Sequence, residues 1–257
     1  MERYALQKWN APVSEAGRKI DAALEKLRHG GTLQPARRRG RLIFGLDLTG
    51  SREATLRNAR IATAAMFDTI KAIGSVAVKL IYYRGTNECR ASEWNDDPGV
   101  VSRCMERLGC ETGETQIARL LRLALGEREK ISGVVFVGDH CEEAPRELLA
   151  LAATLGQRSV PLFMFHECAD HDERSLAAKP LFKRMAELSG GVYVEFKPDS
   201  GVVLREMLSS VGAFTAAGHE GVRQVGRAAT REARQLRGRL LLLGPAPTGE
   251  GGRKESL

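Results

Sequence analysis

The chain has 257 residues, of which 43% are hydrophobic, 28% charged and 5% aromatic, and its formal net charge is +7. This length and apolar content fit one globular domain with extensions, or at most two small domains, and they exclude a chain that is disordered throughout. The charge is uneven: residues 1–41 carry ten basic and four acidic side chains, residues 221–257 carry eight and three, and residues 42–220 carry 21 and 25. The positive charge therefore belongs to two flanks, and the central part is mildly acidic.

Export and membrane insertion have no support in the sequence. The first residues include Glu2 and contain neither the apolar run nor the small-residue cleavage site of a signal peptide. No stretch approaches the roughly 18–20 apolar residues needed to span a bilayer. The five cysteines are odd in number and form no CxxC pair, which indicates reduced thiols. We expect a cytoplasmic protein without a transmembrane segment.

In chain order, the first expected element is an amphipathic helix at 12–30, followed by a basic linker, so that residues 1–40 form an N-terminal extension. Apolar runs then alternate with helical patterns over the expected domain, 41–214. The expected strands are 41–48, 75–84, 88–94, 133–139, 160–167 and 191–196. The expected helices are 52–73, 98–108, 115–130, 145–155, 175–188 and 200–214.

This alternation predicts an α/β fold: a doubly wound, mostly parallel six-stranded sheet with helices on both faces and right-handed crossovers. Residues 88–94 follow the preceding strand so closely that we expect them to form a short antiparallel edge strand. In such sheets, ligands bind at the carboxyl ends of the strands.

The last expected elements are a basic amphipathic helix within 215–243 and a disordered, Pro- and Gly-rich tail at 244–257. If 221–243 is one helix, five arginines fall within an arc of about 120°, at about 100° per residue. These arginines are Arg223, Arg227, Arg231, Arg234 and Arg237. Such a face either is solvated on a docked helix or binds an acidic protein surface, nucleic acid or anionic lipid. The scarcity of aromatic residues weakens the case for single-stranded nucleic acid.

Hydroxyl and carboxylate side chains lie at the ends of three of the expected elements. Asp47, Thr49 and Ser51 occupy alternate positions after the first strand, Thr115 opens a helix, and Asp139 ends the strand 133–139. Oxygen donors of this kind suit a small divalent cation such as Mg²⁺, which also keeps some of its waters. The alternative is that the first three residues only cap the helix that follows them.

With these residues, the sequence over about 41–214 resembles a von Willebrand factor type A (VWA) domain of the bacterial cytoplasmic type. The resemblance is carried by the metal-ion-dependent adhesion site, whose motif is Asp-x-Ser-x-Ser, then a Thr in a second loop, then an Asp after the fourth strand. The matching positions are Asp47, Thr49, Ser51, Thr115 and Asp139. Four features depart from the usual pattern. They are Thr49 in place of Ser, Glu114 before Thr115, Gly138 in place of a small hydroxyl residue, and His140 in place of Gly.

The resemblance implies a binding protein and not an enzyme. Domains of this family hold one Mg²⁺ or Mn²⁺ incompletely, and a Glu or Asp of a partner protein takes the open coordination position. It therefore implies a scaffold or adaptor, and stand-alone members often work beside ATPases or chaperone-like machines.

Two alternatives from other classes stay open. One is a nucleic-acid-binding protein that uses the Arg-rich flanks. The other is a metal-dependent hydrolase with zinc at a His- and Cys-rich edge, although the spacing there matches no zinc pattern. The residues of that edge are His140, Cys141, His166, Glu167, Cys168, His171 and Asp172. The sequence contains no P-loop, dinucleotide fingerprint or GxSxG motif.

Overall fold

A computed structural model of the chain describes residues 40–74 and 76–244. The helix expected at 12–30, the basic linker and the tail from residue 245 onward lie outside the described residues. None of the helices within the described ranges is long and apolar enough to cross a membrane.

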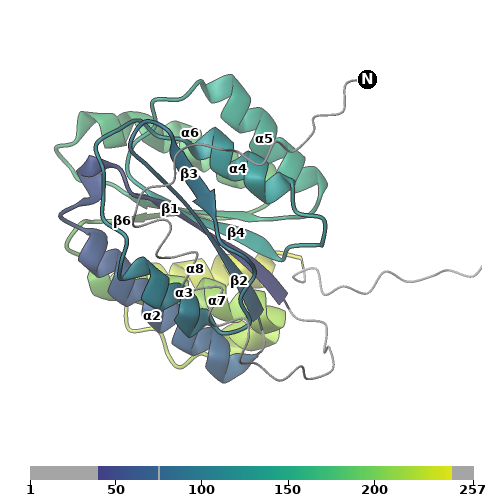
Figure 1. The fold of residues 1–257 in the computed structure, drawn as a ribbon. Coiled ribbons are helices and arrows are strands. Elements are labelled where there is room, and N and C mark those ends of the chain that lie inside the picture. The colour runs from purple at the N-terminus through teal and green to yellow at the C-terminus, as the bar shows by residue number, and fades with distance from the viewer. Residues whose placement is uncertain (1–39, 75, 245–257) are drawn as a thin grey trace, which may run out of the picture.

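One six-stranded sheet runs through the centre of the molecule in the order β3-β2-β1-β4-β5-β6 (Figure 1). Only β3 is antiparallel to its neighbour, and the other adjacent pairs are parallel. The strands are β1 (Gly40–Asp47), β2 (Val76–Arg84), β3 (Glu88–Ala91), β4 (Gly133–Gly138), β5 (Leu162–Glu167) and β6 (Tyr193–Phe196). The predicted fold class is confirmed, including the short antiparallel edge strand.

Helices cover both faces of the sheet (Figure 1). One layer holds α4 (Ile117–Leu125), α5 (Pro145–Gln157) and α6 (Glu173–Ser189). The other holds α2 (Leu56–Ile73), α3 (Pro98–Met105), α7 (Gly201–Gln224) and α8 (Arg231–Leu242). Each layer forms its own apolar core with one face of the sheet.

The central strand β1 shows why the strands could be predicted from the sequence. Its side chains alternate between the two cores: Leu42 and Phe44 lie in the core of α2 and α7, and Ile43 lies in the core of α4 and α5. Because both faces are covered, the strand is a continuous apolar run and not an alternating one.

The first helix of the domain starts later than expected. The prediction began it at residue 52, but α2 begins at Leu56. A 3₁₀ turn, η1 (Gly50–Arg52), comes first and turns the chain away from the end of β1. This turn leaves room for a loop at the carboxyl edge of the sheet.

The prediction that residues 221–243 form a single basic helix was wrong. Helix α7 continues to Gln224 with a kink at Ala217 and Gly218, and α8 begins only at Arg231. Gly218 adopts a φ of +59°, which glycine accepts without strain. Residues between the two helices form a turn, so Arg223 and Arg227 do not lie on α8.

A glutamate of α7 holds this turn in place. The Glu206 carboxylate accepts hydrogen bonds from Ala229 N (3.1 Å), Thr230 N (2.9 Å) and Thr230 Oγ1 (2.6 Å). Thr230 in turn caps α8 by accepting from Ala233 N. Such a contact joins positions more than 20 residues apart, and the helical periodicity of the sequence does not reveal it.

Two of the predicted arginines also support the turn. Arg234 donates to the carbonyls of Ala228 and Ala229, and Arg237 donates to the carbonyl of Gly226. The five arginines therefore do not form one solvated face on a single helix. This removes the helical arc of arginines from the nucleic-acid alternative, whereas the basic residues of 1–39 lie outside the described residues.

Candidate metal centre

The loop after β1 brings its three predicted ligands together. Asp47 Oδ1 accepts hydrogen bonds from Thr49 N (2.8 Å) and Thr49 Oγ1 (2.7 Å). Ser51 Oγ lies 3.2 Å from Thr49 Oγ1. Asp47 is fully buried at the end of the strand, whereas Ser51 is exposed at the surface of the loop. The loop thus presents a carboxylate and two hydroxyls in one contiguous group.

Helix capping does not account for these residues. The residue at the N-cap of α2 is Thr55, which makes no side-chain capping bond, and the side chains of Asp47 and Thr49 bond to each other.

Asp139 follows β4, the strand that pairs with β1, and so lies at the same edge of the sheet. It is buried, and its Oδ1 accepts from His140 N at 3.0 Å. A Cβ atom on the preceding Gly138 would lie 2.6 Å from the Phe136 ring and 3.2 Å from Cβ of Asp47. This crowding explains why glycine occupies a position at which the resemblance predicts a small hydroxyl residue.

The Thr115 loop packs on the other two. Glu111 N donates to the Leu48 carbonyl (3.0 Å), so the segment before Thr115 lies against the β1 loop. Thr115 N donates to the Glu142 carboxylate, and Thr115 Oγ1 accepts from Glu142 N, both at 3.1 Å. Thr115 is therefore tied to the loop that begins at Asp139, and the three predicted loops contact one another.

The charge of this edge leaves room for a cation. Burial, followed by the negative charge of Asp139, raises the pKa of the Asp47 carboxyl to about 6, although hydrogen bonds from Thr49 lower it. Behind the loop, the buried Arg52 guanidinium forms an ion pair with the buried Glu167. Because Arg52 is already paired with Glu167, Asp47 and Asp139 lie close together with no ion pair to a Lys or Arg side chain of their own among the described residues.

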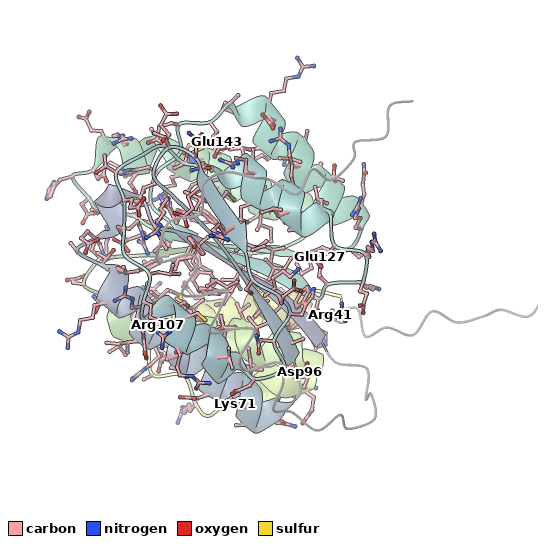
Figure 2. All side chains as sticks on the ribbon, viewed as in Figure 1. Arg41, Lys71, Asp96, Arg107, Glu127 and Glu143 are labelled. Carbon is pink, nitrogen blue, oxygen red and sulfur yellow. The ribbon has the colours of Figure 1, made fainter. Side chains whose placement is uncertain are left out.

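Several residues that shape the site were not predicted from the sequence. Tyr83 of β2 donates to Asp47 Oδ2 at 2.8 Å, and Glu143 accepts from Ile117 N (2.5 Å) and Ala118 N (2.8 Å) at the start of α4. Glu143 lies at the carboxyl edge of the sheet, far from Arg41 at the opposite edge (Figure 2). Of these residues, only Arg52 could have been suspected from the sequence, because it is a charged residue directly after the loop of predicted ligands.

His166 supports Asp139 from the next strand. Its Nε2 lies 3.0 Å from both the Asp139 carbonyl and Ser175 Oγ, and its Nδ1 lies 2.8 Å from the Tyr193 hydroxyl. Ser175 Oγ donates to the Glu167 carbonyl, so Nε2 carries the proton and donates to both oxygens. Burial lowers the pKa of His166 to about 4, which keeps the ring neutral in this role.

The structure gives no support to a zinc site at the His- and Cys-rich edge. Within residues 40–74 and 76–244, no group of three or more His, Cys, Asp or Glu side chains is placed to hold a metal ion. His140 instead contacts the Asp172 carboxylate (2.5 Å), which caps α6, and Cys168 is buried. These side chains serve packing and helix capping.

The comparisons with known proteins bear on the fold. No family model matches the sequence, and no curated protein sequence matches it. Solved structures do match. A von Willebrand factor type A protein from Catenulispora acidiphila has a TM-score of 0.55 and 16% identity, and the match covers 69% of this chain but only 42% of that one. The SpRpn10 VWA domain has a TM-score of 0.52 and 16% identity, with 67% and 95% covered.

A third match is the conserved hypothetical protein BatB from Bacteroides thetaiotaomicron, with a TM-score of 0.51, 13% identity, and 67% and 97% covered. At these identities the likeness concerns the fold alone. The described part of the chain has the fold of a VWA domain.

Proposed function

We propose that this chain is a VWA protein that binds Mg²⁺ or Mn²⁺ and uses the metal to grip a Glu or Asp side chain of a partner protein. The ligands would be Asp47, Thr49, Ser51, Thr115 and Asp139. In this proposal the chain is a scaffold or adaptor and not itself an enzyme, and VWA domains commonly mediate protein–protein interactions.

One observation supports the proposal above the others: the three loops that carry Asp47, Thr115 and Asp139 contact one another at one edge of the sheet, and both aspartates are buried there. Oxygen donors with two carboxylates suit Mg²⁺ or Mn²⁺, and hydroxyl ligands leave the ion enough positive charge to attract a further carboxylate. The five cysteines are free, which supports a reducing compartment such as the cytoplasm.

Calorimetry on metal-free protein tests the first half of the proposal. We expect Mg²⁺ and Mn²⁺ to bind the wild type and to bind Asp47→Asn much more weakly, because one of two carboxylates is lost. Asp68→Asn is the matched control, since Asp68 is an exposed residue of α2. Equal binding by the wild type and Asp47→Asn, or no binding by either, would contradict the proposal.

A pull-down tests the second half. Wild-type protein is incubated with a lysate of its source organism in Mg²⁺ or in EDTA, and the captured proteins are compared with those of Asp47→Asn and Asp68→Asn. We expect a partner that is retained only with metal and only by the wild type and Asp68→Asn. A partner retained equally in EDTA would contradict the role of the metal in binding.

A further inference from the structure

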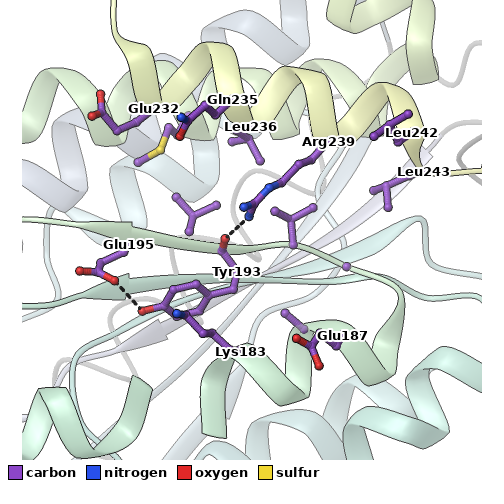
Figure 3. A pocket seen from close by; sticks show the side chains of 15 residues that line it. Lys183, Glu187, Tyr193, Glu195, Glu232, Gln235, Leu236, Arg239, Leu242 and Leu243 are labelled. Atoms are coloured by element: carbon purple, nitrogen blue, oxygen red, sulfur yellow. Dashed lines mark hydrogen bonds between the residues drawn. The ribbon is translucent and has the colours of Figure 1, made fainter. Parts of the chain in front are cut away.

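The sheet has an open edge at β6, two strands away from β4, after which Asp139 of the candidate metal centre lies. Within the described residues no strand follows β6 at this edge. A groove of about 630 Å³ runs along the strand between α6 and α8 (Figure 3). It differs from the edge at β3 in having a helix wall on each side.

The backbone of β6 offers unused hydrogen-bonding groups to this groove. Met164 N donates to the Val192 carbonyl and Cys168 N donates to the Phe196 carbonyl. In a parallel ladder, this register turns the N–H and C=O groups of the alternate residues, Tyr193 and Glu195, away from β5. One of these outward groups is already engaged, because the Tyr193 carbonyl accepts a hydrogen bond from Arg239 Nη1 at 3.4 Å, and Arg239 must release it before a strand pairs there. An added strand could therefore pair with β6 without disturbing β5.

The groove also exposes apolar surface. Leu242, at the end of α8, is 87% exposed, the largest exposure among the large apolar side chains of the described residues. Leu243, which is partly exposed, lines the groove beside it, whereas Leu236, Val192 and Val194 form its buried floor. Apolar surface next to an open strand favours association.

The charges of the groove indicate the occupant. The α8 wall carries Glu232 near the Glu195 end of β6 and Arg239 near Tyr193, and the α6 wall carries Lys183 and Glu187 in the opposite order of charge (Figure 3). A two-fold axis beside β6 would place each helix wall next to the same wall of a second copy, running in the opposite direction. Glu232 would then face the partner's Arg239, and Lys183 would face the partner's Glu187. A two-fold interface requires such self-complementarity.

We propose that two copies of this chain associate through antiparallel pairing of their β6 strands and form one continuous sheet. Because the strands run in opposite directions across the junction, the carboxyl edges of the two sheets point in opposite directions. The two candidate metal centres would lie at opposite ends of the dimer, which would make the adaptor bivalent.

The strand pairing is tested by light scattering after size exclusion on the full chain. The wild type is expected at twice its monomer mass of 28.1 kDa. Glu195→Pro removes an outward N–H that β5 does not use, so the fold should tolerate it and the dimer should be lost. Glu195→Ala loses the same ion pair with Lys179 but keeps the N–H, and it should remain a dimer. A monomeric wild type, or a dimer unaffected by Glu195→Pro, would overturn the proposal.

A charge exchange tests the antiparallel orientation. Glu232→Arg and Arg239→Glu each place like charges opposite one another in the dimer, so each should be monomeric. Mixing the two variants restores both opposite-charge pairs across the interface, and so does the Glu232→Arg/Arg239→Glu double variant when it pairs with a second copy of itself. We expect dimers in both cases, with circular dichroism showing that every variant is folded. Folded variants that dimerise alone as well as in the mixture would overturn this arrangement.

Discussion

At the scale of single residues, Asp47 is the proposed metal ligand whose negative charge also destabilises the folded state when no metal is bound. Without metal, burial and Asp139 raise its folded-state pKa from 3.8 to about 6. The folded state therefore binds the proton more tightly than the unfolded state. The stability from this proton is fully present below pH 3.8 and is lost as the pH rises through 6. At pH 7 the ionised Asp47 costs up to about 3 kcal/mol.

This cost predicts that Asp47→Asn stabilises the metal-free protein at pH 7. Asparagine Oδ1 can still accept from Thr49, and its Nδ2 can donate to the Tyr83 hydroxyl oxygen, so the contacts remain without the charge. In denaturant titrations with EDTA, the variant should exceed the wild type by about 2–3 kcal/mol at pH 7, and the difference should shrink toward pH 4. Added Mg²⁺ should stabilise only the wild type. A less stable variant at pH 7 in EDTA would contradict the electrostatic account.

The buried pair of Arg52 and Glu167 gives a second prediction at this scale. The Nε and Nη2 atoms of Arg52 are buried and make no hydrogen bond to the described residues, so the Glu167 carboxylate is the main counter-charge of the guanidinium. Arg52→Met leaves Glu167 buried without a cation and should cost about 3–5 kcal/mol. Adding Glu167→Gln should recover part of that loss, because neither buried charge remains. Urea denaturation of the two single variants and the double variant measures the coupling, and additive losses would show that the pair is not coupled.

At the scale of elements, the strands could be predicted and several helix ends could not. Strands β1, β4 and β5 are covered on both faces, so each carries an uninterrupted apolar run that is visible in the sequence. Two of the three site loops follow from where β1 and β4 end, whereas the Thr115 loop lies between α3 and α4. The turn before α8 was missed because Glu206, on a distant part of α7, fixes it. Arg52 and Tyr83 were missed because their contacts with Glu167 and Asp47 exist only in the folded chain.

Glu206 should accordingly be a determinant of the docking of α8. Its carboxylate accepts three hydrogen bonds from the turn, and because water can replace part of them at this half-exposed position, Glu206→Ala should cost about 1–2 kcal/mol. Hydrogen exchange should accelerate most over 228–242. Glu220→Ala, an exposed residue of the same helix, is the control. Uniform acceleration across the sheet, or none, would show that the turn does not hold α8.

At the scale of the whole molecule, the two layers share the sheet and should unfold together. Strand β1 contributes side chains to both cores, and the cysteines are distributed between them: Cys104 lies in the core of α2 and α7, whereas Cys89 and Cys141 pack against the other. The +7 charge that suggests a polyanionic partner does not describe this body, because most of it lies on the flanks of the chain.

The cysteines therefore offer a measure of global unfolding. Burial raises the pKa of Cys89 and Cys110 to about 12 and that of Cys141 to about 11, while Cys104 and Cys168 are inaccessible. Because the thiolate is the reactive form, iodoacetamide at pH 8 should modify the native protein about two orders of magnitude more slowly than free cysteine. Mass spectrometry should show five adducts appearing together across the denaturant transition. Fast modification of one thiol in native buffer would instead reveal a layer that opens independently of the sheet.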